Sequence, residues 1–495
     1  MSGVDNADQL LEDINKMMGE GLADHAPQSA APFFQQFLPI PRHLRALDPQ
    51  VRLIIGDKGA GKTQLFQALK FPEGRELLAK VASDHGHLTL PLERLTWRVG
   101  FEVQGTAFPP SGAFDAIKGR EVGDLREIWL ALLVRVLEDD SGGFANDVNA
   151  YTVAVAPAFG GWDLNAVIQQ TKEYEGRILA AIDELDKRLS EKDSYVAVVY
   201  DDLDRVSPGD WETVRATLQG LIQLWAVYSR RWQRIRCKIF LRRDLYERAA
   251  LRGPDIAKIA WNPADLFWNS GELYRLLFKR LANASPDLRA YLERGRLAFK
   301  EEKLLGWVPN AYEEDQFASV VKHVFSEHMG SDPSKGATLR WIPNHLKDGH
   351  GRIFPRPLLR LIQDSTRIEK RDRQAARPHL IHHTAIRGAL DQVSEFRVEE
   401  LVREEFPWLK RIQSSFKERP FRVPAERRVV LKSLNIDWSH EKDLPPETES
   451  DRLLEYLVEL GIGSVRSNGL VDVGDLYLKG LNLKRRGGVA RPKRL

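Results

Sequence analysis

Apolar residues in this chain occur in two patterns, as short runs with almost no charge and as longer stretches in which they recur every three or four positions. The runs at 53–55, 195–200 and 238–241 predict buried strands of a parallel sheet, because strands covered on both faces lack apolar/polar alternation. The stretches at 125–136 and 164–189 have the spacing of amphipathic helices. Strands that alternate with helices predict an α/β fold.

Further segments extend this core. Residues 87–90 and 96–103 read as extended, and 256–261 would supply the last strand. A helix is expected over 263–281. Residues 139–163 instead mix glycine, asparagine, aspartate and proline with a short β-prone run, which predicts an insertion loop or hairpin.

The C-terminal part of the chain has a different character. Residues 285–395 show helical spacing and no strong strand pattern. Residues 453–460 form an apolar helical segment, and the runs at 462–466 and 470–473 flank an Asn-Gly turn, which predicts a small β-hairpin. A helix followed by a hairpin is the layout of a winged helix.

The first strand leads directly into a phosphate-binding sequence, which matches the P-loop pattern GxxxxGK[ST] between a strand and a helix. Its glycines let the backbone approach a phosphate chain, and the following helix points N–H groups at it. Lys62 would reach the β- and γ-phosphates of ATP, and Thr63 would ligate Mg²⁺. The alternative is a Gly-rich turn that binds nothing. The expected ATP contacts are Gly56, Asp57, Lys58, Gly59, Ala60, Gly61, Lys62, Thr63 and Gln64.

An acidic pair follows the strand at 195–200. Asp201 and Asp202 would stand at the carboxyl end of that strand, where open α/β sheets place their ligands. There Asp201 would hold Mg²⁺ through water, and Asp202 would orient or deprotonate the water that attacks ATP. A strand that simply ends in an acidic turn is the alternative, but the presence of a P-loop in the same chain favours the catalytic interpretation.

Three arginines are candidates for contacts with the γ-phosphate. Arg242 and Arg243 follow the strand at 238–241, and arginine at such a position can neutralise charge in a transition state. Arg356 begins a proline-opened helix and could reach a nucleotide from a helical lid. The sequence leaves open two alternatives, a solvated strand exit for the first two and a salt bridge for Arg356.

Composition limits the class of protein. The 495 residues are 43% hydrophobic and 29% charged, as in globular domains, and 73 basic against 70 acidic residues give a net charge of only +3. A surface that binds nucleic acid must therefore be local. Seven basic and no acidic residues lie between Lys479 and Leu495, a patch suited to DNA phosphates, with a solvated chain end as the alternative.

The same composition bears on location. Cys237 is the one cysteine, so the chain can form neither an internal disulfide nor a cysteine-based zinc site, which fits a reducing cytosol. No apolar run approaches the ~20 residues of a membrane helix. Acidic residues near the N-terminus, such as Asp5 and Asp8, do not match a secretory signal. We expect a cytoplasmic protein without membrane segments.

These motifs together resemble the P-loop ATPases of the AAA+/STAND/KAP group. Residues 201–205, DDLDR, are similar to the Walker B motif of KAP-like ATPases, and 238–244 look like their fourth strand ending at a sensor position. Arg356 falls where a sensor arginine of the lid would be expected. The resemblance implies an Mg²⁺-dependent ATPase and a winged-helix appendage. Members of the STAND and KAP groups are often bacterial, and many serve in signalling or anti-phage defence. The resemblance therefore also implies such a role.

The expected architecture is a three-layer α/β P-loop core of the ASCE type, a helical lid and a C-terminal winged helix. The domains are placed at 1–34 for an N-terminal arm or linker, 35–262 for the ATPase core, 263–395 for the lid, and 396–495 for the winged helix with its basic tail.

The preferred function is a conformational switch that binds and hydrolyses ATP and controls homo-oligomerisation or a separately encoded effector protein. The alternative is an ATP-dependent DNA-binding protein of the initiator or loader kind, which would use the winged helix and the basic tail. A P-loop kinase is a third possibility, against which the acidic pair and the lid features count.

Overall fold

The chain forms two compact units. The core unit is Pro39–Leu266, and the helical unit joins Met1–Leu38 to Phe267–Leu495, so the core unit is inserted into the sequence of the helical unit. The computed structural model describes residues 6–20, 29–84, 94–103, 107–138, 144–208, 210–248, 262–372 and 379–487.

A five-stranded parallel sheet in the order β2-β3-β4-β1-β5 forms the centre of the core unit. Its strands are β1 (Leu53–Gly56), β2 (Leu95–Phe101), β3 (Tyr195–Tyr200), β4 (Ile235–Arg242) and β5 (Ala264–Leu266). β4 lies between β1, which leads into the P-loop, and β3, which leads to Asp201. This interposed strand characterises the ASCE class of P-loop proteins, so the predicted core fold is confirmed.

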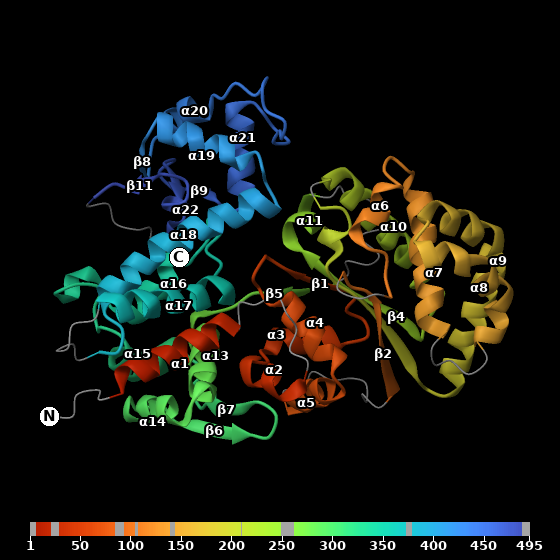
Figure 1. The fold of residues 1–495 in the computed structure, drawn as a ribbon, viewed down its shortest axis with the longest axis horizontal. Coiled ribbons are helices and arrows are strands. Elements are labelled where there is room, and N and C mark those ends of the chain that lie inside the picture. The colour runs from red at the N-terminus through yellow and green to blue at the C-terminus, as the bar shows by residue number, and fades with distance from the viewer. Residues whose placement is uncertain are drawn as a thin grey trace. The chain divides into compact units, whose positions relative to one another are not determined.

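Helices cover both faces of the sheet and give the predicted three layers (Figure 1). They are α3 (Pro41–Leu44), α4 (Lys62–Lys70), α5 (Pro72–Asp84), α6 (Ser111–Asp115), α7 (Val122–Glu138), α8 (Phe144–Gly161), α9 (Leu164–Glu191), α10 (Trp211–Tyr228) and α11 (Arg243–Arg248). Every second residue of β4 from Ile235 to Leu241 joins a hydrophobic core shared with α7, α9 and α10. On the opposite face, Phe240 contacts Phe66 of α4, with ring centroids 5.9 Å apart.

The segment 139–163, expected to be an insertion loop or hairpin, is helical from Phe144 to Gly161, so that expectation is wrong. The helix packs on α9, where the Tyr151 hydroxyl lies 3.0 Å from the Thr171 hydroxyl. Pro157 is tolerated inside the helix on its exposed side, although an internal proline costs about 3 kcal/mol. Burial of one face outweighs that cost. The buried positions recur at helical spacing: Phe144, Val148, Tyr151, Val155 and Ala158.

Three other expectations in this part of the chain have different outcomes. The runs at 87–90 and 256–261 lie outside the described residues. The helix expected over 263–281 begins only at Ser270, because Asn269 and Glu272 form a capping box there, and β5 occupies the start of that range. The last strand of the sheet is thus β5.

The helical unit contains a strand pair that was not expected. β6 (Phe299–Glu302) and β7 (Gly306–Pro309) form a short antiparallel hairpin within 285–395, where the sequence shows helical spacing and no strong strand pattern. β6 has no buried residue, which explains why no apolar run marks it. The helices are α1 (Ala7–Glu20), α2 (Ala30–Gln36), α13 (Ser270–Ala284), α14 (Pro286–Arg294), α15 (Ala318–Val324), α16 (Thr338–His345), α17 (Pro355–Asp372) and α18 (His383–Glu404).

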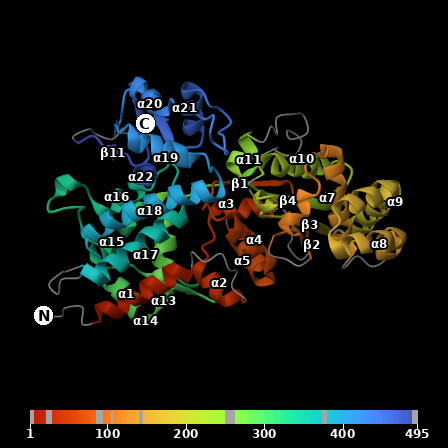
Figure 2. The same cartoon turned by 45° about the horizontal axis from the view of Figure 1, so that its top comes forward.

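The N-terminal segment, expected to be an arm or linker, contains the packed helix α1. It lies against α13 and α17, two helices that follow the core unit in the sequence (Figure 2). Leu11, Ile14 and Met18 are fully buried there, and Asn15 accepts a hydrogen bond from Arg367 at 3.2 Å. The first helix is therefore part of the core of the helical unit.

The end of the helical unit has the order of a winged helix, as predicted. After one helix and a short strand come two helices and an antiparallel hairpin, which confirms the hairpin around the Asn-Gly turn. A bridge between Ala425 and Val471 attaches the short strand to the hairpin. The elements are α19 (Leu409–Glu418), β8 (Arg422–Val423), α20 (Arg427–Leu434), α21 (Ser450–Glu459), β9 (Gly463–Val465), β10 (Val471–Val473), α22 (Asp475–Leu478) and β11 (Lys484–Arg485).

No helix within the described ranges combines the length and the apolar character needed to span a membrane.

Candidate nucleotide site

The P-loop connects β1 to α4 at the carboxyl edge of the sheet. Gly59 and Gly61 have φ values of 86° and 95°, a region that favours glycine, so the loop conformation requires these residues. Gly61 is the N-cap of α4, and the helix begins at Lys62. The first turn of α4 therefore presents backbone N–H groups at the loop, as an anion site needs.

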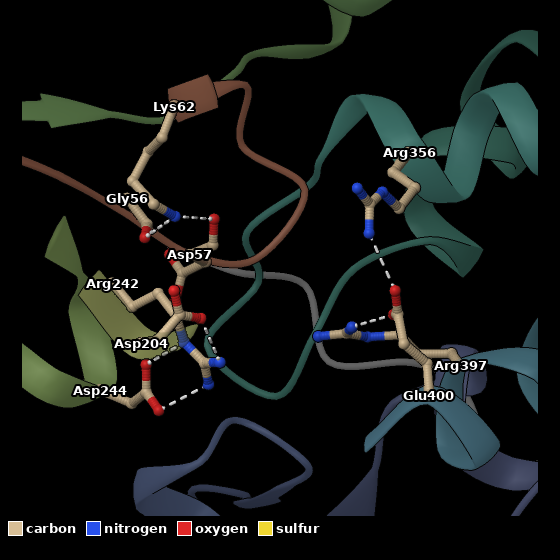
Figure 3. Close-up of polar contacts among 9 residues, drawn as sticks. All are labelled: Gly56, Asp57, Lys62, Asp204, Arg242, Asp244, Arg356, Arg397 and Glu400. Atoms are coloured by element: carbon tan, nitrogen blue, oxygen red, sulfur yellow. Dashed lines mark hydrogen bonds and ion pairs between the residues drawn. The ribbon is translucent and has the colours of Figure 1, made fainter. Parts of the chain in front are cut away.

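Lys62 is directed back into its own loop. Its Nζ donates to the carbonyl oxygens of Gly56 at 2.8 Å and Asp57 at 3.1 Å (Figure 3). Burial lowers the pKa of this amine, and the charge of Arg242 lowers it further, while nearby aspartates including Asp204 and Asp201 oppose the shift. The ammonium thus holds the loop together at the place where phosphate oxygens would compete for it.

Asp201 directly follows β3 and is only 3% exposed. Burial raises its pKa to about 7, and the charge of Asp202 adds to the shift, whereas Lys62 and Thr63 act in the opposite direction. Its Oδ2 atom has no hydrogen-bond partner among the residues that the structure describes. A buried carboxylate oxygen without a partner, beside a threonine hydroxyl, suits a divalent cation with oxygen ligands.

The donor set for magnesium is consistent with this position. Among the described residues no group of three or more His, Cys, Asp or Glu side chains could hold a metal ion by itself. Mg²⁺ in proteins commonly takes one or two protein oxygens together with substrate phosphates and water. Thr63 and Asp201 are the residues that would hold it here.

Asp202 adopts a left-handed backbone conformation, with φ 55° and ψ 25°, before a short 3₁₀ turn at Leu203–Arg205. Such a conformation is uncommon for a residue with a side chain and concentrates at functional sites. Burial raises the pKa of Asp202, which the charge of Arg205 partly offsets. A raised pKa brings a carboxylate closer to the range in which it can take a proton from water.

Arg242 ends β4 and is held by two carboxylates. Its guanidinium donates to both oxygens of Asp244 at 3.0 and 2.8 Å and to Asp204 at 3.1 Å (Figure 3). Only 7% of the residue is exposed. The pairing ties the end of β4 to the acidic motif after β3, because Asp204 belongs to that motif.

Arg243 is held by a second pair of carboxylates. Its Nε donates to Asp57 of the P-loop at 3.1 Å, and its Nη2 is paired with Asp265 of β5. Burial alone would lower the pKa of Arg243, but the two carboxylates outweigh that effect and raise the pKa. Neither arginine is therefore a solvated strand exit, and each links two segments that border the P-loop.

Arg356 belongs to the helical unit and begins α17. Its Nη1 pairs with Glu400 of α18 at 2.9 Å, and Arg397 donates to the same carboxylate at 2.5 Å (Figure 3). The salt bridge that sequence reasoning left open is present. A sensor role for Arg356 stays a prediction.

The structure thus gathers most of the predicted residues at one edge of the sheet. Gly56 lies level with Arg242 in the register between β1 and β4, and Lys62, Thr63, Asp201 and Asp202 influence one another electrostatically. Sequence reasoning missed the carboxylates that hold the two arginines. Of these carboxylates, Asp57 was predicted only as an ATP contact. Asp204 and Asp244 lie within or beside the motifs already chosen and could have been found, whereas Asp265 lies on a strand that was not predicted.

No protein-family model matches this chain, and no curated protein matches it. Structures similar to the chain include the ORC1 protein of Aeropyrum pernix in complex with DNA, at 14% identity over 93% of both chains and a TM-score of 0.35. The ORC2 protein of the same organism, in ADPNP-ADP complexes, is similar at 14% identity over 87% of this chain and 85% of that one, with a TM-score of 0.37. Cdc6p of Pyrobaculum aerophilum shares 14% identity over 96% of this chain and 91% of its own, with a TM-score of 0.30. With scores this low, the fold assignment rests on the P-loop and the strand order, and the KAP or STAND subtype stays a prediction.

Proposed function

We propose that this protein is an Mg²⁺-dependent ATPase that acts as a conformational switch. The observation that carries the proposal is the buried Asp201 oxygen, which has no hydrogen-bond partner in the described part of the chain and lies beside the Lys62-Thr63 end of a P-loop. The sheet order supports it, because β4 separates the two motifs as in ASCE-type P-loop proteins.

The residues have distinct roles in this proposal. Bound Mg²⁺-ATP would supply a polarised γ-phosphate for attack by water. Lys62 would exchange its bonds to two loop carbonyls for bonds to phosphate oxygens. Thr63 and Asp201 would hold the metal, and Asp202 would orient the water and accept its proton.

Switching follows from the links around the P-loop. Arg243 connects the loop to β5, and Arg242 connects β4 to the acidic motif. A bound phosphate that attracts either arginine would weaken its ion pairs with the aspartates at the sheet edge. Such a change could control homo-oligomerisation or a separately encoded effector protein. The part of this switch in bacterial anti-phage defence comes from the sequence resemblance and stays a prediction.

The first test measures phosphate release and assembly state together, by a phosphate assay and light scattering. We expect wild type to hydrolyse ATP, Lys62→Ala to lose both binding and hydrolysis, and Asp202→Asn to keep ATP bound while hydrolysis falls roughly 10²–10⁴-fold. Lys187→Ala, which removes an exposed lysine of α9, is the matched control and should behave as wild type. A wild type that neither binds ATP nor changes state would overturn the proposal.

ATP-dependent DNA binding is the second candidate function. It is favoured by the winged-helix order of α19 to β10 and by exposed cations in that region. Adding duplex DNA to the assay above separates the two candidates. Stimulation of hydrolysis by DNA supports an initiator or loader role, and hydrolysis that is indifferent to DNA supports a switch acting on protein partners.

A further inference from the structure

The helix that would usually read DNA in a winged helix is acidic in this protein. α21 exposes Glu455 and Glu459, and the cation Arg452 on the same helix is paired with Glu455 at 3.2 Å. Asp451, at its start, pairs with Arg427 of α20 at 2.9 Å. With three carboxylates against one basic residue, α21 would repel a phosphate backbone.

The hairpin does not supply the missing positive charge. Arg466 of the hairpin turns back onto Asp472, with Nη2 at 2.6 Å and Nε at 2.9 Å from the same carboxylate oxygen. The turn itself is uncharged, since it reads Ser467-Asn468-Gly469. The α21 face and its hairpin therefore lack the charge that non-specific DNA binding requires.

A different edge of the same region carries exposed cations. β8 and β11 pair in parallel, with Arg422 opposite Lys484, and the backbone N–H of Arg486 donates to Val423 at 2.8 Å. Arg422, Lys484 and Arg486 are all exposed, and none forms an ion pair with any residue that the structure describes. We call these three residues the β8–β11 edge.

The alternation of the two strands explains why only these residues face outward. Val423 is fully buried, and Arg485 turns inward to Asp472 at 2.9 Å and to Asp475. Lys484 and Arg486, the residue after β11, are then about 7 Å apart along the chain. Arg422 lies opposite Lys484 on the neighbouring strand, about 5 Å away. The result is a compact group of three charges that form no ion pair within the described ranges, in segments (419–425 and 479–487) that contain no acidic residue.

The acidic helix and the cationic edge lie apart in the fold. β11 and α21 lie on opposite sides of α19 and α20 in both views (Figures 1 and 2). The region is thus polarised, and a polyanion would approach from the side of β11.

We propose that the β8–β11 edge, rather than α21 and the hairpin, binds the phosphate backbone of nucleic acid. The inference rests on the second candidate function and specifies its surface. Binding through this edge would be independent of base sequence, because backbone contacts position a protein without reading bases. Insertion into an anionic membrane is disfavoured, since no large hydrophobic side chain is exposed among the described residues of these two segments.

The test measures the affinity of the full chain for a fluorescein-labelled 30-bp duplex by anisotropy, at several NaCl concentrations. Replacing Arg422, Lys484 and Arg486 by Gln should raise Kd at least 10-fold near 0.1 M salt and reduce the slope of log K against log salt by about 2 to 3. The matched control removes the same charge from three exposed lysines elsewhere: Lys303, Lys335 and Lys442. That control should keep the affinity within about 2-fold of wild type.

Each outcome decides between surfaces. Equal losses in the edge variant and the control variant would mean that net charge alone drives binding, and would overturn the proposal. Loss of binding in Arg452→Gln without loss in the edge variant would assign the interface to α21.

Failure of wild type to bind the duplex would remove the second candidate function as well, whereas binding of phosphatidylserine vesicles but not DNA would identify a membrane surface. Melting temperatures should be unchanged, since the three exposed side chains lack ion-pair partners.

Discussion

Two consecutive arginines at the end of β4, Arg242 and Arg243, are each held by a pair of aspartates. The pair on Arg243 includes Asp57, which places a carboxylate inside the P-loop itself. A free carboxylate there would repel a triphosphate. In the proposed function, Arg243 would therefore act as a positioning residue that neutralises Asp57.

This role predicts a specific coupling between two substitutions. Arg243→Gln should weaken ATP binding about 10-fold, because it leaves the Asp57 charge unpaired beside the phosphates. Asp57→Asn in the same chain should restore most of the affinity, and calorimetric titration of all four proteins gives the coupling energy. Additive losses in the double variant would show that Arg243 contacts the nucleotide directly.

Asp201 provides a prediction for pH. Its pKa of about 7 in the folded chain lies above the usual value of 3.8, so the native state binds more protons between these values and stability falls as pH rises through them. Asp201→Asn should remove this effect. Without metal, the unfolding free energy of the variant should rise relative to wild type by up to a few kcal/mol as pH increases from 5 to 8. Its melting temperature should rise relative to wild type accordingly.

The measurement is differential scanning fluorimetry, once in EDTA and once with Mg²⁺-ATP in buffer without EDTA. Added Mg²⁺-ATP should stabilise wild type most at pH 8, where Asp201 is ionised, and should not stabilise the variant. A constant difference between the two proteins across this pH range would contradict the raised pKa.

Single helices and strands show how far the sequence could predict the structure. The strands flanking the P-loop and the acidic pair were predictable because burial on both faces leaves a run without charge, as in Tyr195–Tyr200. α8 was missed because its glycine, asparagine and proline are individually typical of turns, although its buried residues have helical spacing. The partner of Arg243 was missed because the three residues of β5 are too few to show a pattern.

α1 gives a prediction at the level of a helix. Ile14 is fully buried where α1 packs against α13 and α17, so Ile14→Ala should lower the unfolding free energy of the helical unit by about 2–4 kcal/mol. Lys16→Ala, on the exposed side of α1, should change it by less than about 0.5 kcal/mol. Urea denaturation followed by far-UV circular dichroism distinguishes the two. Equal effects would mean that α1 does not contribute to the core of this unit.

The molecule as a whole consists of two units with separate cores, and only one of them contains the P-loop. Mg²⁺-ATP at a concentration of 100 times Kd should therefore stabilise the core unit by about 2.7 kcal/mol and raise its melting temperature. The melting temperature of the helical unit should stay the same. Calorimetry of wild type and Lys62→Ala tests this, since the variant should lose the shift. One transition that moves as a whole would mean that the units unfold together.

The packing of α1 onto α17 also sets an order of events during synthesis. Asn15 and Arg367, which are hydrogen-bonded in the folded chain, are 352 residues apart. At roughly 5–20 residues per second, the ribosome needs about 20–70 s to produce α17 after α1 has been made. Until α13 and then α17 have been made, the apolar face of α1 lacks the surfaces that bury it, while the whole core unit emerges and can fold. The helical unit can therefore be completed only after the core unit has been synthesised, and we expect a chaperone to protect nascent α1 until then.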